Sequence, residues 1–413
     1  MNDRKTLHIR AHYYLALMVA LCLPIGRLAP VFIALMFLNW LLEGEFRSKF
    51  RTLAGSKLAL LFIAFYLLHL IGMIYTENTD AGWFDLQVKL SLIILPLIIA
   101  SRPFNEYQLR NIFMMFIAGG IISSLILLSR AVFTWFAYGE NNFFYQAFTF
   151  LIHPSYLSMY FCLCIAWLLY NLLKRDPSNG IPTGVSIAAI LFFSFINVLL
   201  SSKMGLLGMF LVYFSFLVGY IVSRKKYIAG GAGVIAFVLV VFCLVKYVPE
   251  VRDRFNAAAT ALSKDNTNQA EGESTAVRML IWKAGNKLIG DHLLFGVGTG
   301  DAKQELVKEY KARGMSGALE HQLNAHNEFY QVFISLGLVG FTVFIISLLI
   351  PAYLSFCRKD VIYFVFLVLM MINFIPESMF ETQAGVMFYA FFNSLLCFRR
   401  DSDTQNQHIT SSV

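Results

Sequence analysis

A small set of charged side chains stands in or beside the long apolar segments of this chain, and these side chains are the candidates for chemistry. Charge in or near a bilayer costs free energy, so a residue that carries it there is a functional candidate. Most of the basic members fall at one predicted membrane–water boundary, which favours an active region there over one at the middle of the bilayer. The set is Lys89, Arg130, His153, Lys203, Lys246, Arg278, His326, Glu328, Glu377 and Glu381.

His326 leads this set because an imidazole exchanges a proton near neutral pH. Gly337 follows eleven residues later, close to three helical turns, so the spacing predicts that it lies on the same helix face. Gly340 then widens a smooth patch that another helix or a lipid chain could approach closely. The alternative is an interfacial histidine that caps an ordinary packed helix.

The composition indicates that these residues are positioned by membrane helices. Hydrophobic residues make up 58% of the 413 residues and charged residues 14%, with a mean hydropathy of +0.64. Average soluble domains have about 45–50% and about 25%. So few charges exclude a disordered, fibrous or nucleic-acid-binding protein and disfavour a soluble enzyme. The six cysteines lie in or beside apolar segments without a CxxC pair, which favours packing over disulfides or zinc.

An all-α, polytopic membrane fold with about 12 transmembrane helices is therefore predicted. A spanning helix needs roughly 17–25 mostly apolar residues, and some of the candidates are shorter. The segments are 12–25, 28–42, 57–75, 84–100, 111–135, 151–173, 183–201, 204–222, 228–247, 327–350, 361–375 and 384–398.

The basic residues predict the orientation. With a cytoplasmic N-terminus, 18 Lys and Arg fall in cytoplasmic segments and only Arg27 and Lys203 in short outer loops. The predicted organisation is helices 1–9 in residues 1–247, a long outer loop domain at 248–325, helices 10–12 in 326–398 and a cytoplasmic tail at 399–413. Within the loop, 263–274 is predicted as a mobile polar stretch, 277–289 as an interfacial helix and 302–313 as a solvated helix. Its glycines 296, 298 and 300 form a turn.

Several short motifs resemble the O-antigen ligase and polymerase superfamily. The segment from His326 is similar to its signature of His-Asn, nine residues and Gly-x-x-Gly, with Phe341 where Thr or Val is usual. Arg278-Met-Leu-Ile-Trp282 and His292-Leu-Leu-Phe-Gly296-Val-Gly298 resemble its Arg…Trp…His-Pro-x-x-Gly-x-Gly segment, with Leu293 in place of Pro. Ser201-Ser202-Lys203-Met204-Gly205 matches a turn that is commonly Ser-Arg-Gly, and His153-Pro154-Ser155-Tyr156 also fits the family.

This resemblance implies a metal-independent, membrane-embedded glycosyltransferase of the C type, without a cofactor, at the periplasmic face of the bacterial inner membrane. The implied donor is a glycan linked to undecaprenyl pyrophosphate, and the implied acceptor is a lipid A-core hydroxyl or a growing glycan. His326 would be the general base, Arg278 and Lys203 would bind the donor pyrophosphate, and Gly337 and Gly340 would face the lipid chain. Membrane lipids are expected partners and nucleic acid is not.

Four further residues are possible members of this site. Lys89 could approach the phosphates or form a salt bridge at a helix end. Glu377 and Glu381 could position the acceptor or be solvated loop charges, and Asn327 directly follows His326.

Three functions compete for this sequence. Ligation to lipid A-core leads, and a polymerase of O-antigen or a related surface polysaccharide is the alternative with the same chemistry. A polysaccharide transporter would predict mid-bilayer charges and internal repeats, and the sequence shows neither.

Overall fold

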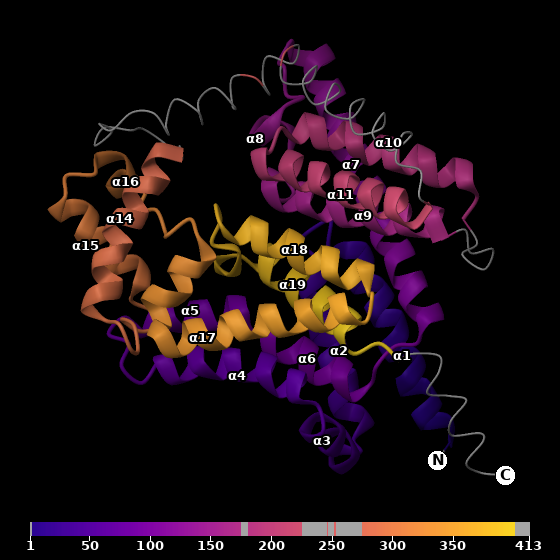
Figure 1. Ribbon diagram of the computed structural model, residues 1–413, viewed down its shortest axis with the longest axis horizontal. Coiled ribbons are helices and arrows are strands. Elements are labelled where there is room, and N and C mark those ends of the chain that lie inside the picture. The colour runs from indigo at the N-terminus through magenta and orange to yellow at the C-terminus, as the bar shows by residue number, and fades with distance from the viewer. Residues whose placement is uncertain (1, 175–180, 225–245, 247–251, 253–274, 401–413) are drawn as a thin grey trace.

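The computed structural model describes residues 2–174, 181–224, 246, 252 and 275–400, and every regular element in those ranges is a helix (Figure 1). The helices are α1 (Asn2–Cys22), α2 (Ala29–Glu43), α3 (Phe46–Ala54), α4 (Lys57–Gly72), α5 (Thr79–Lys89), α6 (Ser91–Ser101), α7 (Glu106–Tyr138), α8 (Tyr145–Phe148), α9 (Pro154–Lys174), α10 (Thr183–Leu200), α11 (Lys203–Arg224), α14 (Thr275–Asp291), α15 (Ala302–Ala312), α16 (Ser316–Glu320), α17 (Glu328–Cys357), α18 (Val361–Phe374), the 3₁₀ turn η2 (Met379–Glu381) and α19 (Gln383–Cys397).

The predicted apolar segments that fall in the described ranges are all helical, with shifted ends. The largest shift is at the first, predicted over 12–25, since α1 begins at Asn2. Residues 84–100 lie in the pair α5–α6, which is read as one stretch from Thr79 to Ser101. Apart from residue 246, the predicted segment 228–247 lies outside the described residues, as do the stretch 263–274 and residues 401–413 of the predicted tail.

Six stretches of the described chain are long and apolar enough to cross a membrane. They are Thr79–Ser101, Glu106–Tyr138, Pro154–Lys174, Thr183–Leu200, Lys203–Val222 and Glu328–Cys357. A seventh arises if α2 and α3, which are bent by 114°, count as one span, and α4, α18 and α19 are shorter apolar helices. The chain is thus a multi-pass helical membrane protein, and the number of twelve spans stays a prediction.

Helices α14, α15 and α16 form a separate layer at one side of the bundle, away from the start of α1 (Figure 1). They share a small core that includes Ile281, Leu306 and Tyr310. This core also contains Ile334 of α17, so the layer is fixed to the first turns of that helix. The helices predicted at 277–289 and 302–313 are confirmed, but both are amphipathic and packed. The first was expected to lie on the membrane surface and the second to be solvated.

Helix α17 is broken at Gly337, where φ is 63° and ψ is −161°. The backbone of Leu294 and Gly296 fills the space beside it, and a Cβ on Gly337 would lie 2.4 Å from the carbonyl carbon of Leu294. The turn is held in this gap by Val297 N–H donating to Ile334 O (2.8 Å) and by Leu338 N–H donating to Leu293 O (2.8 Å).

The break corrects the prediction of one continuous helix face from His326 to Gly340. Gly337 is buried against backbone, because only a residue without a side chain permits this approach at a positive φ. Gly340 is also buried, and a Cβ there would lie 2.2 Å from the Leu336 side chain. The sequence had suggested an open slot for a lipid chain at these two glycines. Neither glycine presents one, because both are buried.

Candidate active site

Three predicted site residues converge from three separate segments. Arg278 comes from the first turn of α14, His326 directly precedes the N-cap of α17, and Glu377 follows α18. An Arg278 Nη2–H donates to Glu377 Oε1 at 3.0 Å. Nδ1 of His326 lies 3.6 Å from Glu377 Oε2, which is an electrostatic contact and too long for a hydrogen bond. The arrangement brings an imidazole, a guanidinium and a carboxylate to one point.

The turn that carries His326 is held on several sides. Trp282, one helical turn after Arg278, donates its indole N–H to Ala325 O at 3.1 Å. The backbone N–H of His326 donates to Asn324 Oδ1 at 3.0 Å, and His326 itself has a φ of 43°, in the left-handed region. A non-glycine residue there costs free energy and persists only where its surroundings impose it. The imidazole position is therefore built into the fold.

Asn327 contributes to this turn through its backbone and side chain and has a structural role. Its side chain caps α17 by accepting from Tyr330 N–H at 3.1 Å, and its own backbone N–H donates to Ser378 Oγ at 3.1 Å. An N-cap of this kind satisfies a helix donor that would otherwise lack a partner. Through Ser378, the same residue ties the His326 turn directly to the Glu377 segment.

The segment with Glu377 and Glu381 is anchored by Phe380, which lies between them in sequence and is fully buried. Its ring packs 5.1 Å from Phe374 and 5.1 Å from Tyr389, measured between centroids. Its backbone N–H donates to Glu328 Oε2 at 2.8 Å. The side chains of Glu377 and Glu381 are 14% and 21% exposed, so the interpretation as solvated loop charges is wrong.

The charges around Glu377 set its protonation. Burial alone would raise its pKa, since a carboxylate loses solvation. The neighbouring His326, Arg278 and His153 outweigh burial and hold the pKa of the Glu377 carboxyl below its ordinary value. Glu377 is therefore an anion at neutral pH.

The guanidinium of Arg278 uses only part of its donor capacity. Its Nη2 donates to the Glu377 carboxylate, while its Nε is buried without a hydrogen-bond partner.

Lys89 lies in a second charged cluster, which is joined to the first through the segment that carries Glu377 and Glu381. It is almost fully buried and bonds to Asp85 of its own helix and to Glu381, the latter at 2.9 Å. His69 Nδ1 lies 3.7 Å from the other oxygen of Asp85. Of the two interpretations left open for Lys89, the structure shows the salt bridge. Its charge is matched by two carboxylates, one of them in the Glu377 segment.

Lys203 begins α11 beside the N-terminal end of α9. The preceding Ser201 has a φ of 45°, which turns the chain sharply from α10 into α11. The next residue, Ser202, donates its hydroxyl to Ser155 at 3.3 Å. Ser155 N–H in turn donates to His153 Nδ1 at 3.4 Å, and His153 lies close enough to Glu377 to interact with it electrostatically. Lys203 is thus placed at the edge of the same region, and its role as a phosphate ligand stays a prediction.

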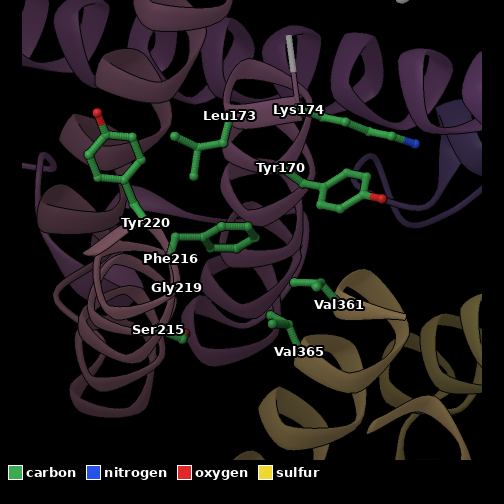
Figure 2. A pocket seen from close by; sticks show the side chains of 9 residues that line it. All are labelled: Tyr170, Leu173, Lys174, Ser215, Phe216, Gly219, Tyr220, Val361 and Val365. Carbon is green, nitrogen blue, oxygen red and sulfur yellow. The ribbon is translucent and has the colours of Figure 1, made fainter. Parts of the chain in front are cut away.

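A cavity of about 480 Å³ lies at the opposite end of the same helices (Figure 2). Tyr170 and Leu173 of α9, Phe216 and Tyr220 of α11 and Val361 of α18 line it. From Pro154 to Lys174, α9 has 21 residues and so runs about 30 Å at 1.5 Å per residue. The cavity is therefore separate from the charged site.

Some residues of this site could be predicted from the sequence, and others could not. Arg278 and His326 were predicted from motifs, whereas the supporting roles of Trp282, Ser378 and Phe380 were not. Trp282 stood in a quoted motif and at i+4 from Arg278, which was a usable signal for a shared helix face. Ser378 and Phe380 stand in no motif, and only their place between two acidic residues pointed to them.

A comparison with protein families supports the motif interpretation. Residues 187–345 match the family model described as O-antigen ligase. The matched region is less than half of the chain but contains Lys203, Arg278 and His326, while Lys89, Glu377 and Glu381 lie outside it. The resemblance stated from the motifs is confirmed over this region. A comparison with curated proteins finds no match.

Proposed function

We propose that this membrane protein is a glycosyltransferase that joins a polysaccharide to lipid A-core, because residues 187–345 match the O-antigen ligase family model. The donor would be a glycan on undecaprenyl pyrophosphate, and transfer would take place at the periplasmic face of the bacterial inner membrane. The observation that carries the proposal is the convergence of His326 and Arg278, both from the matched region, on the partly buried carboxylate of Glu377.

His326 acts in this proposal as the general base. The hydroxyl of the acceptor gives its proton to the imidazole while its oxygen forms a bond to the anomeric carbon of the donor sugar. The bond from that carbon to the pyrophosphate oxygen breaks, and the pyrophosphate leaves with the electron pair. Attack from the opposite face inverts the anomeric centre. Glu377 faces Nδ1, which leaves Nε2 for the acceptor and stabilises the imidazolium that forms.

Arg278 holds the donor pyrophosphate in this proposal, and Lys203 assists it. A guanidinium can bind two phosphate oxygens with parallel hydrogen bonds. The buried Nε of Arg278 has no hydrogen-bond partner and would donate one of these bonds. Its contact with Glu377 fixes the guanidinium before the donor arrives. The neutralised pyrophosphate is then a good leaving group, so the proposed reaction requires no metal ion.

The same chemistry would serve a polymerase, which differs only in its acceptor. The decisive experiment supplies the purified full-length protein with repeat units on undecaprenyl pyrophosphate, with and without lipid A-core. We expect transfer of glycan to lipid A-core. A ladder of longer glycans on the carrier, without transfer, would instead identify a polymerase. No glycosidic bond formed under either condition would refute the proposal of a transferase.

Lys203 provides an internal test of the donor site. Lys203→Arg restores the residue that is usual in the family and should keep or raise activity. Lys203→Ala should raise the donor KM, because a phosphate loses one positive charge. An unchanged donor KM in the alanine variant would show that Lys203 only lies at the membrane boundary with its ammonium in water.

A further inference from the structure

The connection between α2 and α3 is a built corner. Gly44 and Glu45 both have positive φ values, 72° and 54°, and they turn the chain by 114°. If α2 stands along the bilayer normal, α3 lies within about 24° of the membrane plane. The corner is fixed by Lys49, which is buried, pairs with Glu43 at 2.7 Å and donates to Trp40 O at 2.6 Å.

One side of α3 faces the protein and the other is free. Lys49 and Leu53 are buried, and α3 packs against α4 and α6. Residues four apart share a helix side, so Phe46 and Phe50 form one exposed stripe and Arg47 and Arg51 form the next. The two rings lie 6.4 Å apart between centroids and are 42% and 54% exposed.

The charges at this corner are not balanced. The two acidic residues of the corner, Glu43 and Glu45, already form ion pairs with other basic side chains. Their partners are Lys5, Lys49 and Arg102. In the part of the chain that the structure describes, neither Arg47 nor Arg51 pairs with a carboxylate. The exposed side of α3 thus offers two phenyl rings beside two unneutralised guanidinium groups.

We propose that α3 is an interfacial helix that binds the anionic phospholipid surface of the membrane. Phe46 and Phe50 enter the boundary between head groups and acyl chains, as the apolar side of an interfacial helix does. Arg47 and Arg51 then meet the phosphates of anionic head groups, for which a guanidinium is well suited. This proposal does not depend on the glycosyltransferase activity, because α3 is not part of the charged site.

The test is a lipid titration of the purified full-length protein, read by native mass spectrometry. Phosphatidylglycerol and phosphatidylcholine are added separately to wild type and to Arg47→Gln/Arg51→Gln. Each basic residue at an anionic surface contributes about fivefold to affinity, so the double variant should bind phosphatidylglycerol about 25-fold more weakly. Its binding of phosphatidylcholine should not change. Lys303→Gln/Lys311→Gln, which removes two exposed charges from α15, is the matched control.

Three results would overturn the proposal. The arginine variant could bind phosphatidylglycerol as wild type does, which would show that α3 is not the contact. The α15 control could lose as much affinity, which would reduce the effect to net charge. Inorganic phosphate at the lipid concentration could displace the lipid, which would make the arginines a simple anion site.

Discussion

Replacing Glu377 by glutamine removes one negative charge from the site and almost no volume. A unit charge 3.6 Å from the imidazolium is worth about 1 kcal/mol in water and about 5 kcal/mol at an effective dielectric constant of 20. Those values correspond to rate losses of about fivefold and about 5,000-fold. Because the side chains of His326 and Glu377 are only 10% and 14% exposed, we expect a loss nearer the larger value.

The assay is transfer from a purified undecaprenyl-pyrophosphate glycan, with kcat and the donor KM measured for wild type and for Glu377→Gln. The kcat should fall while the donor KM stays level or decreases, because Arg278 no longer shares its charge with a carboxylate. Glu320→Gln, which neutralises an exposed charge on α16, is the control. A Glu377→Gln variant with the wild-type kcat would refute this electrostatic role of Glu377.

The other predictions concern the donor grip, the helix break and the topology. Arg278→Ala should abolish transfer and Arg278→Lys should restore little of it, since an ammonium lacks the two-pronged grip; donor titration of both, at normal protein level, checks this. Gly337→Ala should destabilise the folded protein by about 1–3 kcal/mol, because φ is 63° and the new Cβ would meet Leu294 backbone; an unchanged Tm would contradict it. A cysteine at Lys311 of α15, in a background without Cys357, should react with an impermeant thiol reagent in intact spheroplasts. Reaction only after lysis would reverse the predicted orientation.

Helix positions followed from the sequence because each one is a local property. An apolar run of the required length is visible in any window, so the segments near α9, α10 and α11 could be located to within a few residues. The break in α17 could not be predicted in this way. It depends on the turn at Leu294 and Gly296, more than forty residues upstream, whose backbone enters the gap beside Gly337.

The site was predictable where it lies in motifs and not where it depends on pairing across the fold. His326 and Arg278 were found because their segments resemble known signatures. Their common partner, Glu377, lies 99 residues from Arg278 and outside the matched family region, so no spacing rule connects the two. The segment that carries Glu377 is anchored by Phe380, whose aromatic surroundings come from α17, α18 and α19 and exist only after packing.

The most direct test of the proposed mechanism is transfer by His326→Ala with donor binding measured separately on the same preparation. General-base catalysis typically contributes about 10²–10⁴ in rate, so transfer should fall by that factor while the protein accumulates normally. Donor binding should be retained, because Arg278 and Lys203 hold the phosphates in this mechanism. Loss of donor binding in proportion to rate would make His326 a phosphate-contacting residue. Unchanged transfer would contradict the account, because no proton acceptor would then be required at this position.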